Sequence, residues 1–139
     1  MVGLTGFGDL SPSQISGGMA KRVALARAMA LDPEVLFMDE PSAGLDPIMS
    51  AAIDQLILDL TKKTKTTTLL VTHEMKSAFT VADRMILLHE GVVVAEGPPE
   101  VMRTTEAPLV RQFVDGLPDG PIPLRRNRDE YLRSMTGHD

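Results

Sequence analysis

Several residue types that would define a function class are missing from this 139-residue chain. It has no cysteine, which excludes disulfide bonds and thiolate metal sites. No apolar run approaches the roughly 18 residues that a membrane-spanning helix needs, so a role at a membrane would come through partners. Aromatic residues make up only 4%, which predicts an aliphatic core. The formal net charge of −5 argues against broad nucleic-acid binding, which usually requires a basic surface.

The most informative stretch is a short apolar run that ends in two carboxylates. Residues 35–38 lead directly into Asp39 and Glu40, and Pro41 follows. A run of this length predicts a buried strand of a parallel sheet, and open α/β sheets bind ligands at the C-terminal ends of such strands. Asp39 is suited to hold Mg²⁺, and Glu40 is suited to orient or deprotonate a water that attacks a phosphoryl group. The alternative is a strand that ends in a solvated acidic loop.

A second signal lies at the start of a predicted helix that runs from Met19 to about Leu31. Ser16 is suited to cap this helix, and Gly17 and Gly18 leave the first backbone N–H groups open. These groups and the helix dipole favour an anion, although an ordinary capped helix is the alternative. The apolar residues that recur on one face of this helix are Met19, Val23, Ala26 and Ala30.

A second buried strand is predicted over residues 67–72, which are β-branched and apolar. It ends at His73. If the two strands are parallel neighbours, His73 emerges at the same sheet edge as Asp39 and Glu40. By itself, a histidine at a strand end is usually exposed or capped.

The remaining pattern predicts an α/β domain followed by a tail. Further helices are expected over residues 48–62, 74–82 and 98–103, and a hairpin over residues 85–96. The composition changes after Arg103: residues 107–114 form a short helix, and residues 117–124 are rich in proline. The segment beyond the helix has too little apolar surface to fold alone, so we expect it to be disordered or laid against a partner. The predicted domains are therefore residues 1–103 and a docking arm, residues 104–139.

Together these segments resemble the second half of an ABC-type ATPase cassette. Residues 14–19 resemble the signature loop of that family, and residues 35–40 resemble its Walker B strand with the catalytic glutamate. Residues 42–46 resemble the D-loop, and His73 resembles the switch histidine. The resemblance implies a partial P-loop NTPase fold, in which a mostly parallel sheet is flanked by helices, with part of the helical subdomain and a C-terminal extension.

In this family two cassettes enclose two ATP molecules, so the resemblance assigns roles to the matching residues. The residues implied to bind nucleotide, or Mg²⁺ in the case of Asp39, are Ser16, Gly17, Gly18, Asp39 and Asp46. Ser16 and the two glycines would hold the γ-phosphate of ATP bound to the partner subunit. Glu40 and His73 would be catalytic, polarising the attacking water and sensing the γ-phosphate.

The tail narrows the resemblance to one branch of the family. Residues 110–116 and 119–123 resemble the C-terminal extension of MlaF-type ATPases, which power phospholipid or toluene-tolerance transporters that maintain the Gram-negative outer membrane. The implied partners are a second ATPase subunit, an MlaE-type permease and an MlaB-type STAS-domain regulator, without nucleic acid. The implied location is the cytoplasmic face of the bacterial inner membrane. A non-transport ABC ATPase and a non-catalytic interaction fragment remain alternatives.

One motif of the family is missing. The phosphate-binding loop G-x-x-x-x-G-K-[ST] does not occur, and the glycine-rich residues 3–8 contain no lysine. We therefore expect this chain to be the C-terminal portion of an ATPase, inactive alone because the lysine loop would cradle the phosphates.

Overall fold

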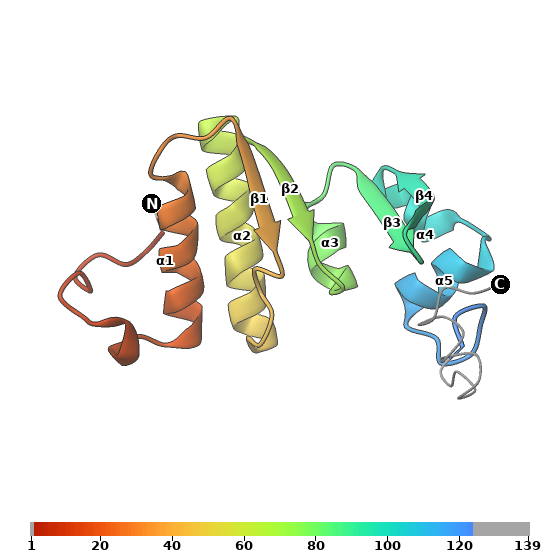
Figure 1. Cartoon of the computed structure of the whole chain (residues 1–139), viewed down its shortest axis with the longest axis horizontal. Helices are drawn as coiled ribbons and strands as arrows, with labels where there is room; N and C mark the ends of the chain where they lie inside the picture. The colour runs from red at the N-terminus through yellow and green to blue at the C-terminus, as the bar shows by residue number, and fades with distance from the viewer. Residues whose placement is uncertain (1, 124–139) are drawn as a thin grey trace, which may run out of the picture. The chain divides into compact units, whose positions relative to one another are not determined.

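The computed structural model describes residues 2–123, and their contacts form two units, Met1–Ala82 and Asp83–Asp139 (Figure 1). The elements of the first unit are η1 (Pro12–Gln14), α1 (Gly17–Met29), β1 (Val35–Asp39), α2 (Pro47–Thr64), β2 (Thr67–Val71) and α3 (Met75–Val81). The elements of the second are β3 (Met85–His89), β4 (Val92–Gly97), α4 (Pro99–Thr104) and α5 (Pro108–Asp115). Within residues 2–123, no helix combines the length and apolar content needed to cross a membrane.

The first unit is built on two parallel strands. Strand β1 pairs with β2 in a register that sets Val35 opposite Thr67 and Asp39 opposite Val71. Figure 1 shows α1 and α2 side by side, with both strands next to α2. The core lies between these helices and one face of the sheet, and its buried residues are Leu25, Leu36, Ile53, Ile57 and Leu60. The prediction of parallel neighbouring strands is confirmed.

Helix α2 follows from its sequence. Asp46 caps it through bonds from the N–H groups of Ile48 and Met49, and Pro47 occupies the first turn, where no N–H is needed. Its apolar residues Ile53, Ile57 and Leu60 face the core. The helix ends at Lys65, which takes a left-handed conformation with φ of 56°.

The predicted apolar face of α1 is not its buried face. The structure buries Gly18 and Leu25, whereas Val23 is 44% exposed and Ala30 is also exposed. The reason is compositional. Alanine and other aliphatic residues occur all around this helix, so their spacing does not select one face, and the contact with α2 decides it.

The two strands are buried on one face only, which corrects the prediction of fully buried strands. The side chains of Val35, Phe37, Leu69 and Val71 point to the other face and are exposed, Phe37 by 72%. The paired register places these residues on the same side of the sheet. Within residues 2–82, α1 and α2 cover only the opposite side, where Leu36 packs.

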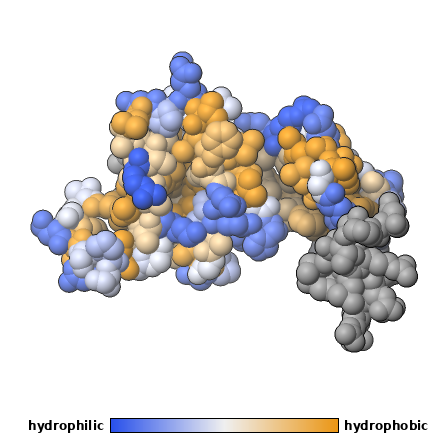
Figure 2. Space-filling model, in the orientation of Figure 1, coloured by the Kyte–Doolittle hydropathy of each residue, from blue (hydrophilic) through white to orange (hydrophobic). Residues whose placement is uncertain are grey.

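The second unit begins with the predicted hairpin of β3 and β4, which are antiparallel. Figure 2 shows apolar surface over this hairpin, where Ile86, Leu88 and Val92 are exposed. Helix α5 packs against α4, and Val110 is only 1% exposed. The helix stops at Gly116, which takes a left-handed conformation with φ of 64°.

The segment after α5 is held by a side-chain clasp. Gln112, which is buried, donates from Nε2 to the carbonyl of Ile122 at 2.8 Å and accepts from its N–H at 2.7 Å. This part of the tail is therefore bonded to α5 through Gln112. In the structure α4 and α5 belong to one unit, and residues 124–139 lie outside the described part of the chain. The domain boundary expected at Arg103 stays a prediction.

Candidate active site

The ends of β1 and β2 bring Glu40 and His73 into direct contact. Glu40 continues the ladder, because its N–H donates to the carbonyl of Val71 at 2.9 Å. The backbone N–H of His73 then donates to Glu40 Oε1 at 2.9 Å, and His73 Nδ1 lies 2.7 Å from the same oxygen. The parallel register therefore places the predicted catalytic pair at one sheet edge.

The backbone of Glu40 is in an uncommon conformation. Its φ is 46°, in the left-handed region, which costs a non-glycine residue about 1–3 kcal/mol. Two donors hold its carbonyl: Ala43 N–H at 3.2 Å and the Lys21 ammonium at 2.9 Å. Lys21 lies on the second turn of α1, so this helix fixes the direction in which Glu40 leaves the strand.

The carboxylate of Glu40 accepts hydrogen bonds on both oxygens. Burial alone would raise its pKa, but the bonds from the side chain and backbone of His73, and from Thr72 Oγ1 at 3.1 Å, lower the pKa below its ordinary value. Glu40 is thus ionised at neutral pH. A carboxylate of lowered pKa is a weak base, so this arrangement suits orienting a water better than taking its proton.

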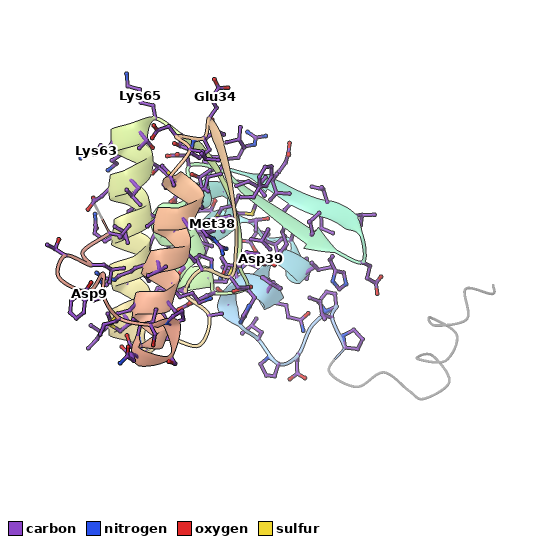
Figure 3. All side chains as sticks on the ribbon, turned by 60° about the vertical axis from the view of Figure 1, so that its left-hand side comes forward. Asp9, Glu34, Met38, Asp39, Lys63 and Lys65 are labelled. Carbon is purple, nitrogen blue, oxygen red and sulfur yellow. The ribbon has the colours of Figure 1, made fainter. Side chains whose placement is uncertain are left out.

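Asp39 lies at the exposed end of β1, at the opposite end of the strand from Glu34 (Figure 3). Within residues 2–123, no group of three or more metal-binding side chains comes together. Mg²⁺ usually takes one or two carboxylates and completes its shell with phosphate oxygens and water. A single exposed aspartate at the end of a strand can supply one such carboxylate.

The N-terminus of α1 has the features of an anion site. Ser16 caps the helix, because its Oγ accepts from Met19 N–H at 3.2 Å. Within the described residues, no acceptor takes the N–H of Gly17 or Gly18. Gly18 also lies close to α2: a Cβ there would come within 2.6 Å of Met49 Cε, the flexible end of that side chain, which would have to shift.

Asp46 has a structural role at the start of α2. Its Oδ1 accepts from Ile48 N–H at 2.9 Å and from Met49 N–H at 3.0 Å, which caps α2. A capping aspartate stabilises a helix by about 1 kcal/mol. The side chain is exposed, and within residues 2–123 its Oδ2 takes no hydrogen bond, so this oxygen remains available to a ligand.

A second polar cluster lies around Glu74, the residue after His73, and Asp54. Asp54 is 4% exposed and accepts from Ser77 Oγ at 2.8 Å. Burial raises the pKa of Asp54, the Ser77 bond lowers it, and the Glu74 charge raises it further, so the net direction is upward. Both carboxylates line a pocket of about 200 Å³ between α2 and α3.

Comparison with known proteins shows what this chain is similar to. The model of the ABC transporter family matches residues 2–43, which include the α1 start and Glu40. A probable ribonucleotide transport ATP-binding protein of Mycobacterium leprae is 45% identical over 94% of this chain and 38% of its own length. The intermembrane phospholipid transport system ATP-binding protein MlaF of Escherichia coli is 41% identical over 94% of this chain and 48% of its own length. MlaF of Haemophilus influenzae is 38% identical, with 96% and 51% covered.

The chain is therefore similar to the ATP-binding proteins of ABC transporters. This likeness implies the P-loop NTPase fold, of which the parallel pair β1–β2 and its helices form part. The chain spans about half the length, or less, of the curated relatives it matches.

The predicted site residues of this chain fall into two groups. Glu40 and His73 touch each other, and Asp39 precedes them on β1. Ser16 and the two glycines lie at the start of α1, which faces the start of α2 through the Gly18–Met49 approach. Lys21 links the groups through the carbonyl of Glu40.

Sequence reasoning missed three residues of the site: Lys21, Thr72 and Glu74. For Lys21 the sequence offers no signal, because no spacing rule connects it to a residue 19 positions away. Thr72 and Glu74 flank His73, so adjacency to the histidine was the available signal.

Proposed function

We propose that this chain is the half of an ABC ATPase subunit that carries the signature, the catalytic carboxylate and the switch histidine, and that the subunit hydrolyses ATP to drive a transporter. The contact between Glu40 and His73 at the ends of two parallel strands is the observation that carries this proposal. Phosphoryl transfer is catalysed mainly by positioning and electrostatics, and this edge supplies both. A phosphate-binding half with the lysine loop would complete the site.

The roles follow from what each group can donate or accept. Ser16, Gly17 and Gly18 bind the γ-phosphate of ATP held by the partner subunit of a homodimer, because the two glycine N–H groups are open and the helix dipole favours an anion. Asp39 holds Mg²⁺ together with the phosphates. Asp46 reaches the nucleotide across the dimer through its unused Oδ2.

ATP would change the bonding of the catalytic pair. Glu40 Oε1 now accepts both bonds from His73. When the His73 side chain turns to the γ-phosphate, Oε1 loses that bond and becomes available to a water. Nucleotide binding would in this way release the carboxylate that orients the attack, and hydrolysis would reopen the dimer to drive the permease.

Phospholipid is the proposed cargo. The names of two relatives point to phospholipid transport, and residues 110–116 and 119–123 resemble the MlaF-type extension. The partners would be an MlaE-type permease in the bacterial inner membrane, at whose cytoplasmic face the subunit would lie, and an MlaB-type STAS-domain regulator bound near the docking arm, residues 104–139.

A reconstituted transporter tests the proposal. The complete ATPase containing residues 1–139 is placed with its permease in phospholipid vesicles, and ATP-dependent movement of labelled phospholipid is compared with movement of labelled ribonucleotide. We expect lipid movement that Glu40→Gln abolishes. Movement of ribonucleotide alone would instead assign the cargo named for the mycobacterial relative. ATP hydrolysis without movement of either cargo would favour a non-transport ATPase, and no hydrolysis would favour an interaction fragment.

A further inference from the structure

The hydroxyl of Thr72 lies between two acidic residues and bonds to both. Thr72 Oγ1 accepts from the backbone N–H of Glu74 at 3.0 Å and lies 3.1 Å from Glu40 Oε2. A hydroxyl has one proton and two lone pairs, and an ionised carboxylate only accepts. The Thr72 proton therefore points at Glu40, and the Glu74 N–H fixes that orientation.

The side chain of Glu74 extends the same network to the loop after β1 and to α2. Its Oε2 accepts from Ser42 Oγ at 3.2 Å and from Ser50 Oγ at 3.2 Å. Both serines are buried, so the loss of this acceptor would leave two hydroxyls unsatisfied. Glu74 thus attaches the loop of residues 41–46 and the start of α2 to the end of β2.

The network is continuous over three segments of the fold. It runs from Ser42 and Ser50 through Glu74 and Thr72 to the carboxylate of Glu40. Its first end lies beside Asp46, which caps α2 and faces the proposed dimer partner. Its other end is the group proposed to orient water. The two serines are buried, and Glu40, Thr72 and Glu74 are half-buried. A polar network whose groups are satisfied holds its members in one geometry.

We propose that Thr72 is a positioning residue for Glu40, and that Glu74 couples Thr72 to the loop of residues 41–46. A partner subunit that binds this loop therefore also sets the direction of the Glu40 carboxylate. This inference rests on the proposed role of Glu40 in hydrolysis and adds to it a route by which dimer contact controls that residue.

Two substitutions at Thr72 separate the hydroxyl from the shape of the side chain. Valine keeps the shape and removes the hydroxyl, whereas serine keeps the hydroxyl. In the complete ATPase, Thr72→Val should lower kcat about tenfold, the scale of one hydrogen bond to a charged group, and leave KM for ATP within about twofold. Thr72→Ser should restore most of kcat. Thr67→Val, the same change at the exposed far end of β2, is the control and should leave kcat unchanged.

A double-mutant cycle tests the coupling. Ser42→Ala with Ser50→Ala removes both donors to Glu74 and should lower kcat, but it should have little further effect in the Thr72→Val background. Equal loss of kcat in Thr72→Val and Thr72→Ser, or fully additive effects in the cycle, would overturn the proposal.

A measurement without turnover keeps this test distinct from that of the proposed function. In the 139-residue chain, amide hydrogen exchange of Glu74 N–H should be faster in Thr72→Val than in wild type or Thr72→Ser. Unchanged exchange in Thr72→Val would show that the hydroxyl does not hold this N–H, and the relay would then be wrong. If exchange changes as expected while Glu40→Gln retains full turnover, the network exists but the role assigned to Glu40 fails, and with it the inference that rests on that role.

Discussion

The imidazole Nδ1 of His73 lies 2.7 Å from the carboxylate of Glu40, although the two residues are 33 positions apart in the chain. The contact exists because two parallel strands end side by side: Glu40 directly follows β1, and His73 lies two residues beyond the end of β2. Glu40 achieves this with a left-handed backbone, and His73 with a backbone N–H aimed at the same oxygen. The following predictions start from this pair and move outward.

Removing the charge of Glu40 should stop turnover. In the complete ATPase, Glu40→Gln keeps the shape of the side chain but loses the charge that orients water, so the rate of hydrolysis should fall about 100-fold or more while ATP stays bound in a closed dimer. Turnover and dimer mass are measured together. The isolated 139-residue chain should show no hydrolysis, because it lacks the lysine loop. Turnover near wild type in Glu40→Gln would contradict the assignment, as would steady hydrolysis by the chain alone.

A bulky cation at the start of α1 should separate binding from hydrolysis. Ser16→Arg obstructs the site proposed for the partner's nucleotide, so hydrolysis should be blocked while ATP binding to the same subunit is largely retained. Ser16→Ala is the matched control for the cap: it should lower helix stability by about 1 kcal/mol without adding bulk. Loss of ATP binding by monomeric Ser16→Arg subunits would contradict the proposed division between subunits.

Asp54 should make the chain less stable as pH rises. Its pKa is raised in the folded state, so the folded chain holds this proton more tightly than the unfolded chain. The stabilisation is complete below the unfolded value, near 3.8, and is lost as pH rises through the folded value. Asp54→Asn should therefore increase the free energy of unfolding at pH 7 and change it less at pH 3, measured by urea denaturation. Asp59→Asn, at an exposed position of the same helix, is the control; an equal effect of both would contradict burial as the cause.

The uncovered face of the β1–β2 sheet should make the isolated chain associate. Phe37 and Leu69 are opposite each other in the register and both exposed. Replacing them with Ser and Thr should reduce binding of a hydrophobic dye and self-association in sedimentation, with a small change in stability because little burial is lost. Unchanged dye binding would show that this face is not the responsible surface.

The tail should be separable at residue 124. Deleting residues 124–139 leaves the Gln112–Ile122 clasp intact, so nucleotide binding should be retained while binding of the STAS-domain regulator weakens.

Gln112→Glu places a carboxylate against the Ile122 carbonyl and should lower the free energy of unfolding by about 1–3 kcal/mol. Pull-down of the regulator and chemical denaturation are the measurements. Normal regulator binding and transport after the deletion would refute the docking arm.

Much of the fold follows from local sequence. Apolar runs closed by charge or proline mark β1 and β2, and two apolar runs on either side of Glu90 and Gly91 mark the hairpin. Ser16, Asp46 and Gly116 set helix boundaries through caps whose chemistry is local, and the cap predicted at Ser16 is confirmed. These features need only neighbours along the chain.

Other features depend on packing between distant residues. The buried face of α1 is chosen by contact with α2, since the helix itself is nearly uniform around its axis. The exposed face of β1 depends on which side receives helices, and the clasp by Gln112 depends on a chain reversal that composition does not reveal.

The sequence by itself determined the motifs of the candidate site and their order, because each motif is a short stretch with its own chemistry. Only the tertiary structure decided how they are connected. Lys21 binds the carbonyl of Glu40 from 19 positions away, and Thr72 bonds to the Glu40 carboxylate from 32 positions away. Thr72 also accepts from the backbone N–H of Glu74, whose direction the sequence does not specify. Hydrogen bonds require distance and direction at once, and for residues far apart in the chain both are set by the packing of strands and helices.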